Sequence, residues 1–117
     1  MKSDELKKRT KEFAHRRVKL ANALPHSTLG GHIQKQLIRC STSVVANYRA
    51  ACRALSKASF VSKISIVIEE ADESYFWLEF IIDEDMLTNT QVESLVQEAN
   101  ELTAIFTFSR KTARRNN

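Results

Sequence analysis

The sequence predicts an all-α fold, in which a single domain forms an up-down-up-down antiparallel four-helix bundle. Only two glycines and one proline occur in 117 residues, and a β-rich domain of this size would need more turn residues. Apolar residues recur at three- and four-residue steps through four long segments, as in helices that bury one face. A hydrophobic content of 43% is enough for one core in a chain of this length. We therefore expect one domain over residues 1–117.

The first predicted helix covers residues 3–24. Ser3 is a candidate N-cap at its start. Its core face combines apolar and small residues at helical spacing: Leu6, Thr10, Phe13, Ala14, Leu20, Ala21 and Leu24. Arg17 lies in the middle of this face, and an unpaired buried charge is strongly destabilising. We expect Arg17 to pair with an acidic residue of the third helix, or to lie where the face opens to solvent.

The first connection is predicted over residues 25–31, which hold the only proline and both glycines. Adjacent glycines can resemble a phosphate-binding loop, but no Lys-Ser or Lys-Thr pair follows and no strand precedes, which argues against a P-loop. The second predicted helix covers residues 32–57. Asn47 on its core face could fix the register of the bundle. That core face is expected to contain Ile33, Leu37, Cys40, Val44, Asn47 or Tyr48, Ala51 and Leu55.

A row of basic residues lies on the opposite side of the second predicted helix. At 100° per residue these side chains fall within an arc of roughly 80°. One interpretation is a solvated face, and the other is a track for phosphates or for the acidic surface of a partner. We call this set the basic ridge: Lys35, Arg39, Arg49, Arg53 and Lys57.

The third predicted helix begins near Ser59, a candidate cap, and ends near Asp85. Its predicted core face contains Phe60, Ile64, Val67, Ile68, Ala71, Tyr75, Leu78 and Ile82. A second apolar patch on its far side contains Ile66, Phe76, Trp77 and Phe80. This patch indicates either additional core burial or a subunit interface. We favour the interface, because aromatic residues concentrate at interface cores.

The fourth predicted helix follows a short turn over residues 86–89 and extends to about Thr112. The segment 90–93, Thr-Gln-Val-Glu, fits a capping box at its start. Its core face is expected to contain Val92, Leu95, Val96, Ala99, Leu102, Phe106 and Ser109 or Ala113, while Ile105 and Phe108 lie off this face and could extend the subunit interface. A basic tail suits the negative end of a helix dipole and would also suit nucleic acid: Arg110, Lys111, Arg114 and Arg115.

Charge is distributed in blocks along the chain. Residues 1–57 carry thirteen Lys or Arg and three acids, and residues 58–101 carry one Lys and eleven acids. The remaining residues add four basic side chains and no acid, for a net charge of +4. Such segregation predicts that oppositely charged elements pack beside one another, within a subunit or between subunits.

The sequence offers little support for an enzyme. It shows no nucleophile–base pair, phosphate loop or metal-ligand spacing. Glu69, Asp72 and Glu73 share part of a helix face, but carboxylate bundles that bind metals pair each Glu with a His three residues on. The three histidines of this chain are scattered. We therefore predict no catalytic residue, metal, cofactor or small-molecule substrate, and expect these acids to be solvated or salt-bridged.

Cys40 and Cys52 are expected to be reduced thiols, with Cys40 in the core. Twelve residues apart on one helix, they would be separated by about 18 Å, beyond disulfide reach. No apolar run approaches the roughly 20 residues of a membrane span, and the N-terminus lacks a signal-peptide core. We expect a cytoplasmic protein without a membrane partner.

Several segments resemble the four-helix-bundle proteins encoded by intervening sequences of bacterial 23S rRNA genes. The resemblance covers the chain from Phe13 to the basic tail. It rests on Gln36-Leu37-Ile38-Arg39, on Thr42-Ser43-Val44-Val45-Ala46-Asn47-Tyr48-Arg49-Ala50-Ala51, and on Glu69-Glu70-Ala71-Asp72-Glu73-Ser74 with Trp77-Leu78-Glu79.

This resemblance implies a ring-like homo-oligomer, in particular a pentamer, and no enzyme chemistry. It also implies kinship to the bundle accessory protein of diversity-generating retroelements, which works with reverse transcriptase and RNA. Two residues depart from the family pattern. Val45 replaces a glycine or other small residue, which affects close helix packing. Ala50 replaces a glutamate, which leaves Arg49 and Arg53 less neutralised.

Two functions follow as hypotheses. The first is a non-enzymatic, oligomeric bundle that binds RNA through the basic ridge and the basic tail, with phosphate contacts that are salt-sensitive and weakly sequence-selective. The second is a protein-interaction scaffold, in which the basic ridge packs against the acidic third helix of a neighbouring subunit.

Overall fold

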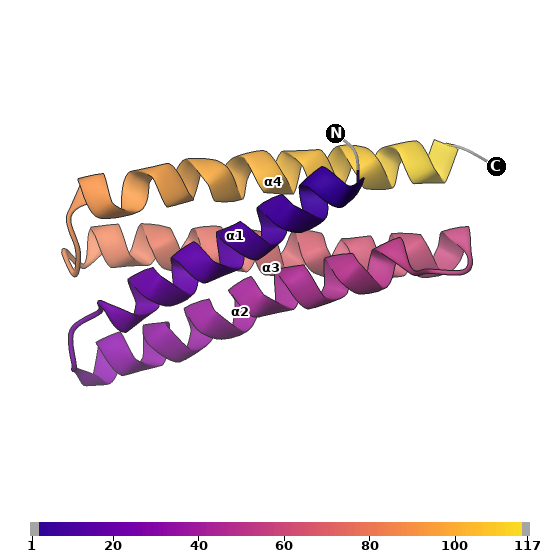
Figure 1. Cartoon of the computed structure of the whole chain (residues 1–117). Helices are drawn as coiled ribbons and strands as arrows, with labels where there is room; N and C mark the ends of the chain where they lie inside the picture. Colours follow the sequence, from indigo (N-terminus) through magenta and orange to yellow (C-terminus); the bar gives the residue numbers. More distant parts are fainter. Residues whose placement is uncertain (1–2, 116–117) are drawn as a thin grey trace.

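Four long α-helices make up the computed structural model, which describes residues 3–115 (Figure 1). They are α1 (Ser3–Asn22), α2 (Thr28–Cys52), α3 (Lys57–Asp83) and α4 (Asn89–Arg115). Consecutive helices run in opposite directions, and the described part of the chain forms an elongated body of 49 × 21 × 20 Å. The predicted all-α four-helix bundle is confirmed.

The helix α1 differs from the other three in length and direction. It has 20 residues, whereas α2, α3 and α4 have 25 to 27, which makes α1 roughly 8–10 Å shorter at 1.5 Å per residue. It runs obliquely to the other helices (Figure 1). It packs mainly against α2 and meets α4 over a smaller area, whereas α3 packs extensively on both α2 and α4.

The two ends of the bundle hold different connections. We call the end that holds the α1–α2 and α3–α4 connections the closed end. The opposite end holds the α2–α3 connection, the start of α1 and the last turns of α4, and we call it the open end (Figure 1).

The buried residues of α1, α2 and α4 match the predicted core faces closely. Every predicted apolar or small residue of the α1 face is buried, and Thr10 is 1% exposed. One prediction on α2 is wrong: Leu55 is fully exposed, because α2 ends at Cys52 and Leu55 lies in the following turn. Asn47 is half-buried, and its side-chain amide donates to Ser43 within the same helix at 3.0 Å.

The core face of α3 is rotated from the predicted one. The buried positions alternate in steps of three and four: Ile64, Val67, Ala71, Ser74, Leu78 and Ile81. Several predicted positions are only half-buried beside it: Phe60, Ile68, Tyr75 and Ile82. Because α3 packs on both α2 and α4, apolar residues flank its core face on two sides. The apolar pattern alone therefore does not locate the centre, which includes the polar Ser74.

The start of α2 lies four residues earlier than predicted. Ser27 is the N-cap, and its hydroxyl accepts a hydrogen bond from the backbone N–H of Gly30 at 2.9 Å. Gly30 and Gly31 are therefore the third and fourth residues of the helix and do not belong to the connection. The capping serine outweighs the low helix propensity of two glycines.

The other predicted helix boundaries shift in the same way. Ser56, in place of the predicted Ser59, caps α3 by accepting from the Ser59 N–H at 3.0 Å. Lys57 therefore begins α3 and does not end α2. The predicted capping box at Thr90 is also displaced, because the Gln91 side chain accepts from the Thr88 N–H at 3.0 Å.

Candidate nucleic-acid interface

A buried arginine fixes α1 against the rest of the bundle. The side chain of Arg17 is completely buried. Its Nε donates to Ser74 Oγ at 3.1 Å, and its Nη1 donates to the Phe13 carbonyl at 3.1 Å and to Glu98 Oε1 at 3.2 Å. Its Nη2 donates to the Leu95 carbonyl. One side chain thus connects α1 to both α3 and α4.

The acidic partner of Arg17 is on α4, so the predicted pairing with an acid of the third helix is wrong. The position is also sealed from solvent, against the second expectation. α3 contributes the hydroxyl of Ser74 instead. Burial lowers the pKa of Arg17 to about 9, and the Glu98 carboxylate opposes this shift. Arg17 therefore remains protonated at neutral pH, and its guanidinium carbon lies 3.3 Å from the centroid of the Phe13 ring.

The basic ridge predicted on the second helix is divided in the structure. Arg39 pairs with two acids of α3, with Glu70 at 2.9 Å and with Glu73. The hydrogen bond with Glu73 raises the pKa of Arg39. Lys57 donates from Nζ to the carbonyl of Arg114 at 3.3 Å. Part of the ridge is therefore engaged within the chain. The Arg39 pairs are a contact between oppositely charged helices, as the segregation of charge predicted.

Arg49 and Arg53 instead face two basic residues of another helix. They lie one turn apart on α2, and Lys7 and Lys11 lie one turn apart on α1. Together with Thr10, Val45 and Tyr48 they line a groove of about 350 Å³. Among residues 3–115, the ion pairs within 4.0 Å involve none of these four cations. We call Lys7, Lys11, Arg49 and Arg53 the basic quartet.

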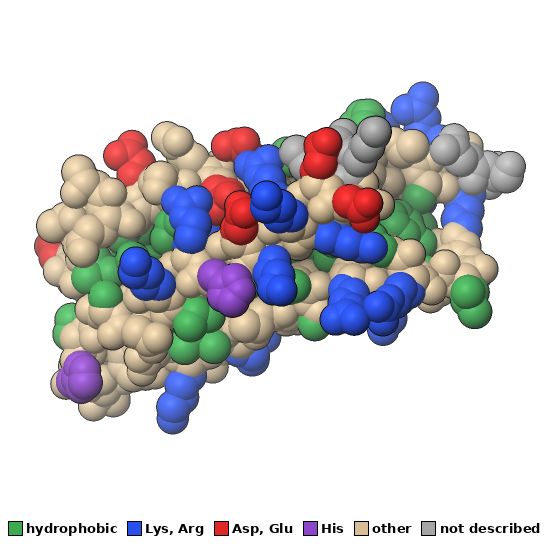
Figure 2. Space-filling view, viewed as in Figure 1, with side chains coloured by type: hydrophobic (Ala, Val, Ile, Leu, Met, Phe, Trp, Pro, Cys, Tyr) green, Lys and Arg blue, Asp and Glu red, His purple; other side chains and the backbone are tan. Residues whose placement is uncertain are grey.

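The sequence pattern indicated half of the basic quartet, Arg49 and Arg53, and not the other half. Lys7 and Lys11 are visible as exposed positions of α1, one turn apart, but pairing them with α2 requires the relative rotation of two helices. Figure 2 shows Lys and Arg side chains spread along this face, with several of them close together right of its centre. Lys35, the remaining ridge residue, is exposed on α2 about four to five turns before the quartet arginines.

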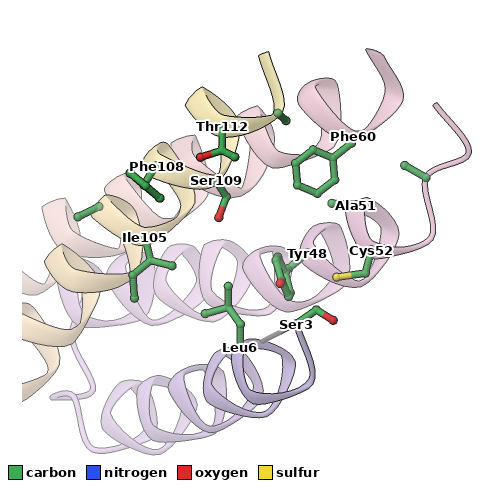
Figure 3. A pocket seen from close by; sticks show the side chains of 13 residues that line it. Ser3, Leu6, Tyr48, Ala51, Cys52, Phe60, Ile105, Phe108, Ser109 and Thr112 are labelled. Atoms are coloured by element: carbon green, nitrogen blue, oxygen red, sulfur yellow. The ribbon is translucent and has the colours of Figure 1, made fainter. Parts of the chain in front are cut away.

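An apolar cleft adjoins the groove at the open end. It measures about 900 Å³ and is lined by all four helices, with Leu6, Tyr48, Phe60, Ile105 and Phe108 among its walls. Figure 3 shows these side chains around the space between α1 and α2 on one side and α4 on the other. Tyr48 lines both the groove and the cleft. Ile105 and Phe108, which the sequence placed off the core face, belong to this cleft.

The predicted basic tail lies along the last turns of α4, at the same end. Its four residues and Thr107 surround a hollow of about 340 Å³: Arg110, Lys111, Arg114 and Arg115. Arg110 donates from Nη1 to Ser65 Oγ of α3 at 3.2 Å. The open end thus combines the basic quartet, the apolar cleft and the basic tail.

The aromatic patch of α3 lies on another face and is partly core. Trp77 and Phe80 are half-buried and pack against the core cluster, and Trp77 meets His32 of α2 with ring centroids 5.5 Å apart. Phe76 is 51% exposed and contacts Trp77 edge-to-face, with ring centroids 4.9 Å apart. Ile66 is half-buried. Additional core burial therefore accounts for Trp77 and Phe80, and it leaves Phe76 as the exposed member.

Cys40 and Cys52 are free thiols, as predicted, and Cys40 is buried in the core. Burial raises the pKa of Cys40 to about 12. Over residues 3–115, the structure brings together no group of three His, Cys, Asp or Glu side chains suited to a metal ion. Within the same residues, no helix is both long enough and apolar enough to span a membrane.

These features define a class: a small antiparallel four-helix bundle that carries a basic groove at one end. The chain belongs to the 23S rRNA-intervening sequence protein family, whose model matches residues 2–107. The resemblance noted in the sequence is therefore confirmed for the family. Kinship to the retroelement accessory protein stays a prediction.

A solved structure shares this fold. It is the crystal structure, at 1.70 Å resolution, of a protein of unknown function from the S23 ribosomal protein family of Bacteroides thetaiotaomicron. The two chains are 34% identical, the match covers 95% of this chain and 99% of that one, and the TM-score is 0.86. A search of curated proteins found no match.

Proposed function

We propose that this protein binds RNA through the basic quartet, with the basic tail extending the surface, and that it catalyses no reaction. The observation that carries the proposal is the convergence of Lys7, Lys11, Arg49 and Arg53 on one groove. Unpaired like charges held together repel one another, and an anionic ligand relieves this repulsion. Phosphates are suitable ligands, because arginine binds them with two parallel hydrogen bonds.

Exposure and pairing rank the predicted contacts. Arg49 and Arg53 are exposed and outside the ion pairs of the described chain, so they are the main phosphate ligands from the basic ridge. Arg39 shares its charge with Glu70 and Glu73 and contributes less. Such contacts position the nucleic acid without reading its sequence.

The test measures RNA affinity over a range of salt concentrations for the wild type and for Arg49→Glu/Arg53→Glu. If both arginines neutralise phosphates, the slope of log K against log salt falls by about two in magnitude. The matched control is Lys8→Glu/Lys19→Glu, which changes the net charge equally at exposed positions outside the quartet, the basic ridge and the basic tail. An equal loss in both variants would show that binding follows net charge and would contradict this site.

A second candidate role, subunit assembly, is favoured by Phe76. An aromatic ring that is half-exposed within an aromatic cluster is typical of an interaction surface. We propose that Ile66, Phe76, Trp77 and Phe80 contribute to a homo-oligomer, in accord with the ring-like pentamer that the family resemblance implies. Light scattering of the wild type and Phe76→Glu tests this, with a smaller mass expected for the variant. An unchanged mass would reject the interface.

The scaffold alternative assigns the basic ridge to a neighbour's α3. Glu70 and Glu73 of α3 already pair with Arg39 of the same chain, so fewer acids are left for a neighbour. If Arg49→Glu/Arg53→Glu breaks the oligomer, the scaffold function is supported. If the oligomer persists and RNA binding falls, RNA binding is supported.

A further inference from the structure

We infer that the open end takes an unpaired RNA strand, with its phosphates on the basic quartet and at least one base in the adjoining apolar cleft. This inference rests on the proposed RNA binding and specifies which form of RNA is bound. It is carried by the adjacency of two different surfaces, one cationic and one apolar, at the same end of the bundle (Figures 2 and 3).

Tyr48 is the wall between these two surfaces. It lines both the groove and the cleft, is 5% exposed, and contacts the Phe106 ring with centroids 5.4 Å apart. Because Phe106 is fully buried, Tyr48 is held in place from behind. A ligand that reaches across Tyr48 therefore meets arginine and lysine on one side and apolar side chains on the other. A nucleotide has this division, with an anionic phosphate and an aromatic base.

The size and lining of the cleft suit aromatic bases. Its volume of about 900 Å³ lies within the range of about 300–1,000 Å³ for small-molecule sites. Phe108 lines it while remaining 69% exposed, so one ring is available for stacking. Ser109 and Thr112 also line the cleft, and their hydroxyls can donate to or accept from the polar edge of a base.

A duplex would not use this cleft. Paired bases are stacked inside the helix, and double-stranded RNA presents mainly phosphates and 2′-hydroxyls to a protein. An unpaired strand can turn its bases out and stack them on aromatic side chains. The apolar cleft is therefore the element that would distinguish the two forms, while the basic quartet would bind both.

Charge also argues against the open end of a second copy of this chain as the occupant of the cleft. The basic quartet and the basic tail both lie at the open end, and two such ends would repel each other. A strand of phosphates is complementary to this surface.

The experiment compares binding of one RNA sequence as a single strand and as a duplex, for the wild type and Phe108→Ala. Base stacking contributes about 1–3 kcal/mol per base, so the variant is expected to bind the single strand roughly 5- to 150-fold more weakly. Its affinity for the duplex should not change. The control is Leu55→Ala, which also truncates an exposed apolar residue of this end but lies outside the cleft lining. It should match the wild type on both RNAs.

A second variant and a spectroscopic signal test the inference without relying on Phe108→Ala alone. Thr112→Trp, at an exposed position that lines the cleft, should fill the cleft and weaken single-strand binding selectively. A 2-aminopurine base in the strand should lose fluorescence on binding to the wild type, because stacking quenches it. That loss should be smaller with Phe108→Ala. Thermal unfolding confirms that each variant is folded.

The outcomes separate this inference from the function on which it rests. If the wild type binds single strand and duplex equally, or if Phe108→Ala weakens both equally, the cleft takes no base and the inference is overturned, while RNA binding stands. If neither RNA binds, the proposed function fails and the inference fails with it. Weakening confined to the single strand, together with the fluorescence change, supports it.

Discussion

The closed and open ends of this bundle differ in how tightly the helices pack. Toward the closed end, Arg17 connects three helices through hydrogen bonds to Ser74, Leu95 and Glu98, and it is fully buried. At the open end, the apolar side chains between α2 and α4 line a cleft, and Phe108 is 69% exposed.

The helix α1 is placed differently from its three neighbours. α1 is five to seven residues shorter than its neighbours and crosses them obliquely (Figure 1). Its second half holds Arg17, a buried charge that is costly to leave unpaired, and its first half carries Lys7 and Lys11. A buried charge is weak support for stability in itself, but it fixes where α1 lies. The position of α1 in turn places Lys7 and Lys11 beside Arg49 and Arg53.

The largest expected difference between the two ends is in thiol reactivity. Cys40 is fully buried in the core, and Cys52 lines the open cleft. A thiol reagent should modify Cys52 in the native protein and reach Cys40 only through unfolding, more than about 10³-fold more slowly if stability is at least about 5 kcal/mol. Mass spectrometry of the time course measures both rates. Equal modification rates for both thiols would show that the core is not sealed.

The pH dependence of stability gives a check on Cys40. Burial raises the pKa of Cys40 to about 12, so the native state retains a proton that the unfolded state loses from about pH 9. The contribution of this thiol to the free energy of unfolding therefore falls as pH rises from 9 toward 12. Cys40→Ala should reduce this decline relative to the wild type.

The same substitution at the two ends should have unequal effects on stability. Phe13 is fully buried beneath Arg17, and Phe13→Ala should lower the free energy of unfolding by about 3–5 kcal/mol. Phe108→Ala removes an exposed ring and should change it by no more than about 0.5 kcal/mol. Urea denaturation measures both. A comparable loss at Phe108 would mean that the cleft is occupied or closed in solution.

The sequence was sufficient to predict the helices and most of the core. The step of three and four residues places Phe13, Leu37 and Leu102 inside without reference to any other helix. Helix ends were less predictable, because Ser27 and Ser56 cap their helices in place of the residues that composition favoured. Leu55 shows the consequence, since an apolar residue just beyond a helix end has no core to enter.

What joins two helices could not be predicted from either helix alone. Arg17 required a partner, but whether α3 or α4 supplied it depends on how the helices are arranged around the core. The basic quartet has the same origin, because Lys7 and Lys11 belong with Arg49 and Arg53 only once α1 crosses α2 at a particular angle. The apolar cleft is lined by residues of all four helices, so no single helix predicts it.

Glu98 and Glu70 pair with a buried and an exposed arginine respectively, and their removal should destabilise the protein to different extents. Both effects on the free energy of unfolding should be no larger than that of Phe13→Ala. Glu98→Gln removes the carboxylate that faces the buried Arg17 and should lower the free energy of unfolding by about 3 kcal/mol. Glu70→Gln removes one partner of Arg39, whose side chain is 49% exposed, and should cost at most about 1 kcal/mol. Urea denaturation at low and high salt tests this, because salt screens only the exposed pair effectively. Equal losses that respond equally to salt would contradict the sealed position of Arg17.

The smallest expected changes in the free energy of unfolding come from the two adjacent glycines at the closed end. A Cβ on Gly30 would lie 2.0 Å from the carbonyl oxygen of Pro25, whereas a Cβ on Gly31 would meet no atom within 4 Å. Gly31→Ala should therefore raise the free energy of unfolding by about 0.4–1 kcal/mol, since alanine restricts the unfolded chain and favours the helix. Gly30→Ala should lower it by about 1–3 kcal/mol, because the backbone of the connection must shift. Thermal unfolding of the two variants measures the difference. Stabilisation by both would mean that the α1–α2 connection yields easily, and that the tight packing of the closed end begins only at Arg17.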